Sequence, residues 1–239
     1  MQNKIQILST KKISDSFIKL ADENNICIDS LNFIETEESV SDEIKNRIIE
    51  LSQQKITTIF TSSNAVKAVE KIVGDQTKWE IFCIEPATKK KIEDIFLNSS
   101  IVAVAKDAEE LSGKIITDKS IRQIVFFCGN QRRDLLPSQL RKHEIDVEEL
   151  IVYKTIEKPQ TVSKKYDGIL FFSPSGVRSF FAKNKLDTTT QIFSIGKTTA
   201  EEVKNFSNNT IVISEIPDTG KLIGEVIKYF STIKNCLNE

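Results

Sequence analysis

Several common signatures of catalytic and binding sites are missing from this 239-residue sequence. It contains one histidine, and no Ser–His arrangement, carboxylate pair or metal-ligand cluster is apparent. Neither a P-loop nor a G-x-G-x-x-G pattern occurs, so the usual nucleotide fingerprints are absent. The sequence therefore offers no support for a histidine-activated nucleophile, a protein-bound metal or a nucleotide-binding loop.

Closely spaced cysteines and long apolar runs are also missing. The four cysteines have no paired spacing for zinc or a redox dithiol, and we interpret them as reduced, packed thiols: Cys27, Cys83, Cys128 and Cys236. The longest apolar runs, 101–105 and 124–128, are far too short to span a bilayer. The first residues have a strand pattern and no apolar signal region, so we expect a cytoplasmic protein without a membrane partner.

Excess charge of one sign is absent as well. The formal net charge is −1, with 28% charged and 39% hydrophobic residues, as in an ordinary soluble globular chain. Such a balance exerts no general attraction on nucleic acid. We expect a monomer that acts on a small molecule, and any anion binding must be local.

One stretch of the chain, residues 168–181, has the pattern of a strand, a tight turn and the start of a helix. Ile169–Phe172 is a short apolar run, typical of a strand covered on both faces in a parallel sheet. Pro174 is expected to stop the strand and Ser175 to cap a helix whose apolar stripe includes Val177 and Phe180. The turn aims backbone N–H groups and hydroxyls at one point, which suits an anion.

The same construction occurs earlier, in residues 58–66. Phe172 follows Phe60 by 112 residues, and the 193–199 segment follows 82–88 by 111. The opening third of each half also matches at offsets of 119 or 120, as in Ile5 with Ile124 and Leu20 with Leu140. The chain is therefore interpreted as a tandem duplication near residue 119.

Strand and helix patterns alternate through both halves, which predicts α/β architecture with parallel sheets wound on both faces. Ligands collect at the carboxyl ends of strands in such folds, where the Ser- and Thr-rich turns fall. Residues 26–34 are expected to be extended, and Glu35–Glu38 to form an acidic break before a helix that starts near Val40. Trp79 is interpreted as a packing residue.

The order and spacing of five motifs resemble the uroporphyrinogen-III synthase family, over nearly the whole chain. The motifs are Phe60-Thr61-Ser62-Ser63-Asn64-Ala65-Val66, Cys128-Gly129-Asn130 with Arg133-Asp134-Leu135-Leu136, Val152-Tyr153-Lys154-Thr155, Phe171-Phe172-Ser173-Pro174-Ser175-Gly176, and Ile195-Gly196-Lys197-Thr198-Thr199-Ala200. The resemblance implies two flavodoxin-like lobes, one inserted in the other and joined by a two-stranded hinge. We expect 1–34 with 155–239 to form the first lobe, and 35–154 the inserted lobe.

The resemblance also implies a reaction. The family closes linear hydroxymethylbilane, expels its hydroxyl as water and inverts the D ring through a spiro intermediate, in haem, sirohaem or corrinoid biosynthesis. Such a lyase needs no cofactor. Its substrate carries eight carboxylates, so the protein must hold anions, bend the chain and assist loss of hydroxide. A noncatalytic bilobed protein that binds an anionic small molecule remains the alternative, and a nucleotide-binding regulator is a weaker one.

Tyr153 is the candidate catalytic residue, because the family's matching tyrosine is given the role of hydrogen-bond donor to the departing hydroxyl. Its other interpretation is an amphipathic tyrosine at a strand end, packed on its ring with the hydroxyl in water. Gly129 and Asn130 permit close backbone approach, although an ordinary left-handed turn explains them nearly as well.

The remaining candidates are expected to contact substrate through hydroxyl, amide or ammonium groups. Four serines, at 62, 63, 173 and 175, are equally explained as helix N-caps, and Lys197 is equally explained as a solvated side chain. The candidate substrate-binding set is Thr61, Ser62, Ser63, Asn64, Gly129, Asn130, Ser173, Ser175, Gly176, Lys197, Thr198 and Thr199. Glu85-Pro86 stands where the other copy has Gly196-Lys197, so we expect fewer contacts from the inserted lobe.

Overall fold

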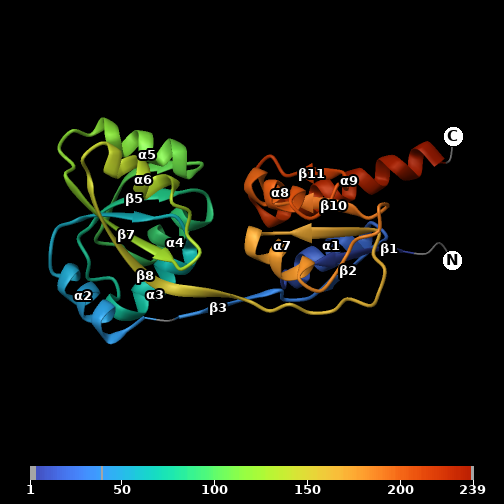
Figure 1. Cartoon of the computed structure of the whole chain (residues 1–239), viewed down its shortest axis with the longest axis horizontal. Coiled ribbons are helices and arrows are strands. Elements are labelled where there is room, and N and C mark those ends of the chain that lie inside the picture. Colours follow the sequence, from blue (N-terminus) through green and yellow to red (C-terminus); the bar gives the residue numbers. More distant parts are fainter. Residues whose placement is uncertain (1–3, 39, 238–239) are drawn as a thin grey trace. The chain divides into compact units, whose positions relative to one another are not determined.

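The computed structural model describes residues 4–38 and 40–237, and side chains as far as residue 233. These residues form two compact units (Figure 1): unit 1 comprises 1–35 and 156–239, and unit 2 comprises 36–155. Unit 2 is thus inserted into unit 1 in the sequence. In the described part of the chain, no helix has both the length and the apolar character needed to cross a membrane.

Unit 1 has a five-stranded sheet with the order β11-β10-β9-β1-β2, in which each neighbouring pair of strands is parallel. Figure 1 shows the N-terminal β1 and β2, in blue, beside the C-terminal β9 and β10, in orange. The elements are β1 (Ile5–Ser9), α1 (Asp15–Glu23), β2 (Ile26–Ser30), β9 (Gly168–Phe171), α7 (Pro174–Phe181), β10 (Gln191–Ser194), α8 (Lys197–Lys204), β11 (Ile211–Ile213) and α9 (Thr219–Leu237).

Unit 2 is built around a six-stranded sheet with the order β3-β8-β7-β4-β5-β6. Its elements are β3 (Ile34–Glu37), α2 (Asp42–Ser52), β4 (Thr57–Phe60), α3 (Ser63–Val73), β5 (Glu80–Ile84), α4 (Ala87–Ile95), β6 (Ser100–Ala105), α5 (Ala108–Thr117), β7 (Gln123–Gly129), α6 (Leu135–Lys142) and β8 (Asp146–Glu157). Both chain crossings between the units lie on β3 and β8, which are hydrogen-bonded neighbours.

Apolar residues cover both faces of each sheet, as expected for buried parallel strands. In unit 1, α1 and α9 pack on one face through residues such as Ala21 and Val226, and α7 and α8 pack on the other through Val177 and Val203. In unit 2, α2, α3 and α4 share one face, and α5 and α6 share the other. The predicted fold class, α/β with two doubly wound parallel-sheet lobes and one inserted in the other, is confirmed.

The two units differ on one sheet face. Among the described residues of unit 1, no helix takes the place that α2 has in unit 2. The irregular segment 158–167 packs there instead, through Val162 and Tyr166. A cavity of about 210 Å³ lies beside Leu8, Ile169 and these two residues. In an ordinary doubly wound sheet, a crossover helix joins two strands in the position of β2 and β9. Here the whole of unit 2 is inserted between these strands, so the described residues of unit 1 form no such helix.

Three details differ from the sequence prediction. The expected acidic break at Glu35–Glu38 is wrong for Glu35–Glu37, which belong to β3, because pairing with β8 stabilises an exposed polar edge strand. The extended segment 26–34 is divided into β2 and the start of β3. Tyr153 does not end its strand, since β8 continues to Glu157.

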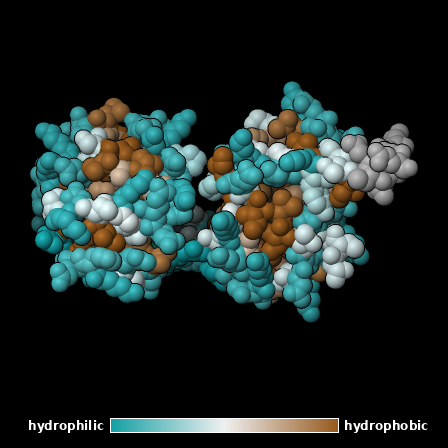
Figure 2. All heavy atoms as spheres, turned by 90° about the horizontal axis from the view of Figure 1, so that it is seen from above, coloured by the Kyte–Doolittle hydropathy of each residue, from teal (hydrophilic) through white to brown (hydrophobic). Residues whose placement is uncertain are grey.

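The surface and the buried thiols need no special explanation. On the face shown in Figure 2, each unit has apolar patches bordered by polar side chains, which is usual for globular proteins. Trp79 is 1% exposed and donates a hydrogen bond from Nε1 to the Leu51 carbonyl at 3.1 Å, as the packing interpretation predicts. Cys83 and Cys128 are free and buried, and Cys27 is free and half-buried; Cys236 lies outside the described side chains.

Candidate functional site

The strand order reverses once in each sheet, and the candidate residues lie near these two reversals. From the central β1 of unit 1 the chain first moves outward to β2, and later continues on the other side through β9, β10 and β11. In unit 2, β7 and β4 are the corresponding central pair. Ligands of doubly wound sheets bind outside the carboxyl ends of the strands at such a reversal. The candidate residues follow these strands or their neighbours.

In unit 2, four candidate residues lie where β4 ends and α3 begins. The Ser62 Oγ accepts a hydrogen bond from the Asn64 backbone N–H at 3.2 Å, so Ser62 is the N-cap. Thr61, Ser62, Ser63 and Asn64 are all half-buried. The N-cap side chain satisfies the Asn64 N–H, and the Ala65 N–H donates to the Ser62 carbonyl at 3.1 Å, so only the N–H groups at the very start of the helix precede its hydrogen bonds.

Gly129 ends β7 and lies against the ring of Tyr153. A Cβ atom at Gly129 would lie 2.5 Å from Tyr153 Cζ and 2.8 Å from its hydroxyl oxygen. Neither Gly129 nor Asn130 has a positive φ, so the alternative of a left-handed turn is wrong. The absence of a side chain at Gly129 is instead what allows the tyrosine ring to approach the backbone.

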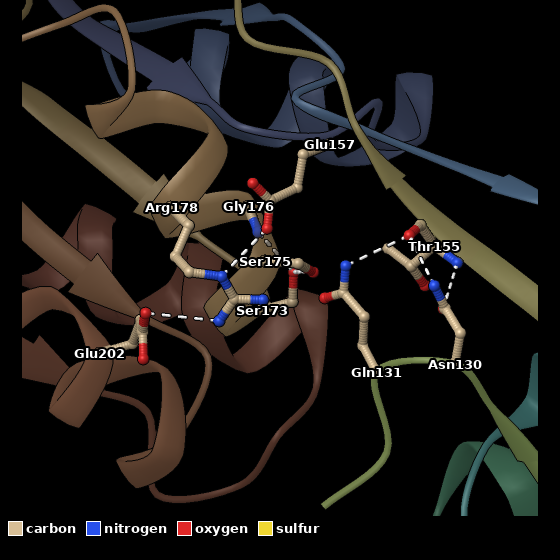
Figure 3. A network of polar contacts seen from close by, with 9 residues as sticks. All are labelled: Asn130, Gln131, Thr155, Glu157, Ser173, Ser175, Gly176, Arg178 and Glu202. Atoms are coloured by element: carbon tan, nitrogen blue, oxygen red, sulfur yellow. Dashed lines mark hydrogen bonds and ion pairs between the residues drawn. The ribbon is translucent and has the colours of Figure 1, made fainter.

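Asn130 holds β8 beside the end of β7. Its Oδ1 accepts a hydrogen bond from the Thr155 N–H at 2.8 Å, and its Nδ2 donates to the Thr155 carbonyl at 3.5 Å. Gln131 Nε2 donates to the same carbonyl at 3.2 Å (Figure 3). The amide groups of Asn130 and Gln131 therefore extend the strand pairing past Tyr153, which fixes the course of β8 at this point.

Tyr153 lies half-buried in this cluster and packs against the core formed by α2, α3 and α4. Burial raises the pKa of its phenol, and a hydrogen bond with the Ser62 side chain partly opposes the rise. The phenol is therefore protonated at neutral pH. Within unit 2, the structure brings Tyr153, Ser62 and Gly129 together, with the phenol as a potential proton or hydrogen-bond donor.

The next strand of unit 2 presents an acid at the equivalent position. Glu85 is exposed after β5, and Pro86 caps α4 without a side-chain hydrogen bond. Thr88, in the first turn, is buried. This end of the sheet is thus less suited to an anion than the ends of β4 and β7.

In unit 1, α7 begins two residues earlier than the sequence predicts. Ser173 caps the helix, and its Oγ accepts a hydrogen bond from the Gly176 N–H at 3.1 Å. Pro174 occupies the first helical position, because its fixed φ and missing N–H suit that position. The prediction that Ser175 is the N-cap is therefore wrong; Ser175 is buried with its Oγ 3.1 Å from that of Ser173.

The neighbouring helix α8 starts from Gly196, which cannot cap it with a side chain. Lys197 is exposed, Thr198 is half-buried and Thr199 is buried. Because β10 is hydrogen-bonded to β9, the starts of α7 and α8 lie at the same edge of the sheet. The candidates Ser173, Ser175, Gly176, Lys197, Thr198 and Thr199 therefore share one edge of unit 1.

Arg178 connects these two helices and was missed in the sequence. Its Nε lies 3.0 Å from Glu157 Oε1 at the end of β8, and its Nη1 lies 3.4 Å from Glu202 Oε1 on α8 (Figure 3). Two carboxylates thus share the guanidinium. Arg178 serves to hold α7 beside α8, and a single charged residue within a helix gives no sequence signal for that role.

Thr10 and Lys11 follow the central strand β1 and were also missed. Thr10 is buried, and its Oγ1 donates a hydrogen bond to the Leu170 carbonyl at 2.7 Å. The offset of 119 between the two halves aligns Thr10 and Lys11 with Gly129 and Asn130. That offset was the signal that could have found them.

The fold and these strand ends define a class of two-lobed α/β proteins whose central strands lead into hydroxyl- and amide-rich turns. No group of His, Cys, Asp and Glu side chains suited to a metal ion occurs among the described residues. The chain belongs to the uroporphyrinogen-III synthase HemD family, whose model matches residues 17–224. The match includes the turns after β4, β7, β9 and β10.

Individual relatives agree with this assignment. A uroporphyrinogen-III synthase of Schizosaccharomyces pombe is 23% identical, covering 81% of this chain and 82% of its own length. One of Saccharomyces cerevisiae is 24% identical, covering 92% and 89%. Among solved structures, a mutant uroporphyrinogen III synthase of Thermus thermophilus superposes with a TM-score of 0.68 at 12% identity, covering 95% and 99% of the two chains. A uroporphyrinogen-III synthetase of Helicobacter pylori gives 0.64 at 16% identity, covering 94% and 99%.

Proposed function

We propose that this protein is a lyase that closes hydroxymethylbilane to uroporphyrinogen III, with loss of water and inversion of the D ring. The observation that carries the proposal is membership of the family over both units. The relatives matched over most of their length bear the name of this enzyme.

Carboxylate binding is the first task that this reaction sets. The starts of α3, α7 and α8 present backbone N–H groups beside the hydroxyls of Ser62, Ser173 and Thr198. Helix N-termini bind anions through such groups and through the helix dipole. This mode of binding needs little net positive charge, in agreement with the net charge of −1. We infer that the candidate substrate-binding set acts in this way.

Loss of the substrate hydroxyl is the chemical task, and we assign it to Tyr153. Its phenol is neutral at physiological pH because burial raises its pKa. A neutral phenol can donate a hydrogen bond to the departing oxygen as the carbon–oxygen bond breaks. Contact with Gly129 and the hydrogen bond with Ser62 hold the ring, so that the donor is already oriented.

The decisive assay supplies freshly made hydroxymethylbilane and separates isomer III from isomer I, which forms spontaneously. We expect isomer III in proportion to protein concentration, without added metal or cofactor. If only isomer I forms, the enzymatic proposal is wrong. In that case binding of the octacarboxylate without turnover identifies a noncatalytic binding protein.

We further infer that the protein works as a monomer in the cytoplasm, on a small molecule and not on nucleic acid. The even charge balance supports the last part of this inference, since it exerts no general attraction on nucleic acid. Light scattering after gel filtration should give about 27.1 kDa, the mass of one chain.

We also propose that lobes 1–34 with 155–239 and 35–154 change their relative orientation when ligand binds. Solution scattering that is identical with and without product would contradict that motion.

A further inference from the structure

We propose that Lys11 binds one carboxylate of the substrate in unit 1, a role that the candidate set did not include. The inference rests on the proposed function for the identity of the anion. It starts from the position of Lys11 directly after the central strand β1, next to the strand-order reversal between β1 and β9.

The backbone holds Lys11 at this position. Thr10 donates hydrogen bonds to the Leu170 carbonyl from its backbone N–H, at 3.1 Å, and from its hydroxyl, at 2.7 Å. The Lys11 carbonyl accepts a hydrogen bond from the Ser9 hydroxyl at 2.6 Å. These bonds fix Thr10 and the carbonyl group of Lys11, so the backbone from which the Lys11 side chain extends is ordered.

The ammonium group lies between the starts of two helices. Lys11 Nζ lies 4.2 Å from the ring centroid of Phe172, which directly precedes the Ser173 N-cap of α7. It also lies 3.4 Å from the hydroxyl of Thr219, the first residue of α9. The ammonium therefore lies beside residues at the start of α7 and of α9, and both a helix N-terminus and an ammonium favour an anion.

The carboxylate of Asp218, near Lys11, does not take the place of that anion. In the described part of the chain, Lys11 has no carboxylate within salt-bridge distance, whereas Asp218 Oδ1 accepts a hydrogen bond from the Lys221 N–H at 3.0 Å. Lys11 is half-buried, and the resulting desolvation lowers its pKa, with Asp218 partly opposing this. A ligand carboxylate would place a negative charge in direct contact with the ammonium.

The test measures binding of uroporphyrin III, a stable octacarboxylate, by wild type, Lys11→Met, Lys11→Arg and Lys12→Met. Lys12 is the adjacent exposed lysine and serves as the matched control. We expect Lys11→Met to weaken binding about 10- to 100-fold, as for loss of a charge-assisted hydrogen bond. Lys11→Arg should restore most of the affinity, and Lys12→Met should leave it unchanged.

Kinetics separate binding from chemistry. In the isomer III assay, Lys11→Met should raise KM by a similar factor with little change in kcat, because the carboxylate is the same in ground and transition states. Equal affinity of Lys11→Met and wild type would overturn the proposal. Should Lys11→Met fail to fold, Lys11→Gln repeats the measurement with a polar side chain. A wild type that binds uroporphyrin through Lys11 but makes no isomer III would disprove the proposed reaction alone.

Discussion

Substitution of Gly129 by alanine tests how closely the backbone must approach Tyr153. The added Cβ would meet Tyr153 Cζ at 2.5 Å, whereas ordinary contacts begin at 3.4 Å, so the ring must move by about 0.9 Å. Added volume at a packed site costs about 1–3 kcal/mol of unfolding free energy. A displacement of about 1 Å at a reacting group costs on the order of 100-fold in rate.

We therefore expect Gly129→Ala to lower the midpoint of thermal unfolding and to reduce kcat for isomer III about 100-fold. The matched control is Gly113→Ala on α5, where a Cβ would have nothing within 4 Å. That change removes a glycine from a helix and should stabilise the protein by about 0.5–1 kcal/mol without loss of activity.

A double-mutant cycle isolates the contact. If the cost of Gly129→Ala comes from the ring, the same substitution made in Tyr153→Ala should have little further effect on stability. Two results would refute the reasoning: full activity and stability of Gly129→Ala, or an equal loss of stability with and without the tyrosine ring.

Three further predictions follow from named contacts. Tyr153→Phe should lower kcat at least 100-fold with an unchanged unfolding midpoint. Because burial raises the pKa of the Tyr153 phenol, wild-type activity should persist from pH 7 to above about 10 and fall as the phenol ionises. Ser173→Ala should cost about 1 kcal/mol in denaturant unfolding, whereas Ser14→Ala should cost less than about 0.5 kcal/mol, because the Ser14 side chain accepts no hydrogen bond from a backbone N–H of its helix. Hydrogen bonds from Arg47 lower the pKa of Glu148, so Glu148→Gln should be less stable than wild type at pH 7, and thermal melts should show this difference vanishing as pH falls below about 4. Unchanged melts across that range would exclude the Glu148 contribution.

Much of the architecture was predictable because local patterns and long-range topology agree in this chain. Apolar runs such as 169–172 mark buried strands, and the repeat offsets relate the turns of the two halves. Helix starts were less certain by one or two residues, since Ser173 and Ser175 are both good caps. Only the backbone, with Pro174 at the first helical position, decides between them.

The contacts that shape the site were not predictable from local patterns. Tyr153 and Gly129 are 24 residues apart, and a register shift in the β7–β8 pairing places them opposite each other. The ion pairs of Arg178 join three separate elements. Such contacts depend on how distant strands and helices are aligned in the folded protein. Local patterns in a single sequence do not reveal this alignment.

The insertion of unit 2 between β2 and β9 has a consequence for how the chain is made. The central strand β1 is synthesised before unit 2, whereas its partner β9, which begins at Gly168, is synthesised after it. The intervening segment 36–155 contains every strand of its own sheet except parts of β3 and β8, so it can fold first during synthesis. Until β9 has been synthesised, the edge of β1 that pairs with it has no partner strand. We therefore expect chaperone binding or aggregation to concentrate in the β1-α1-β2 segment.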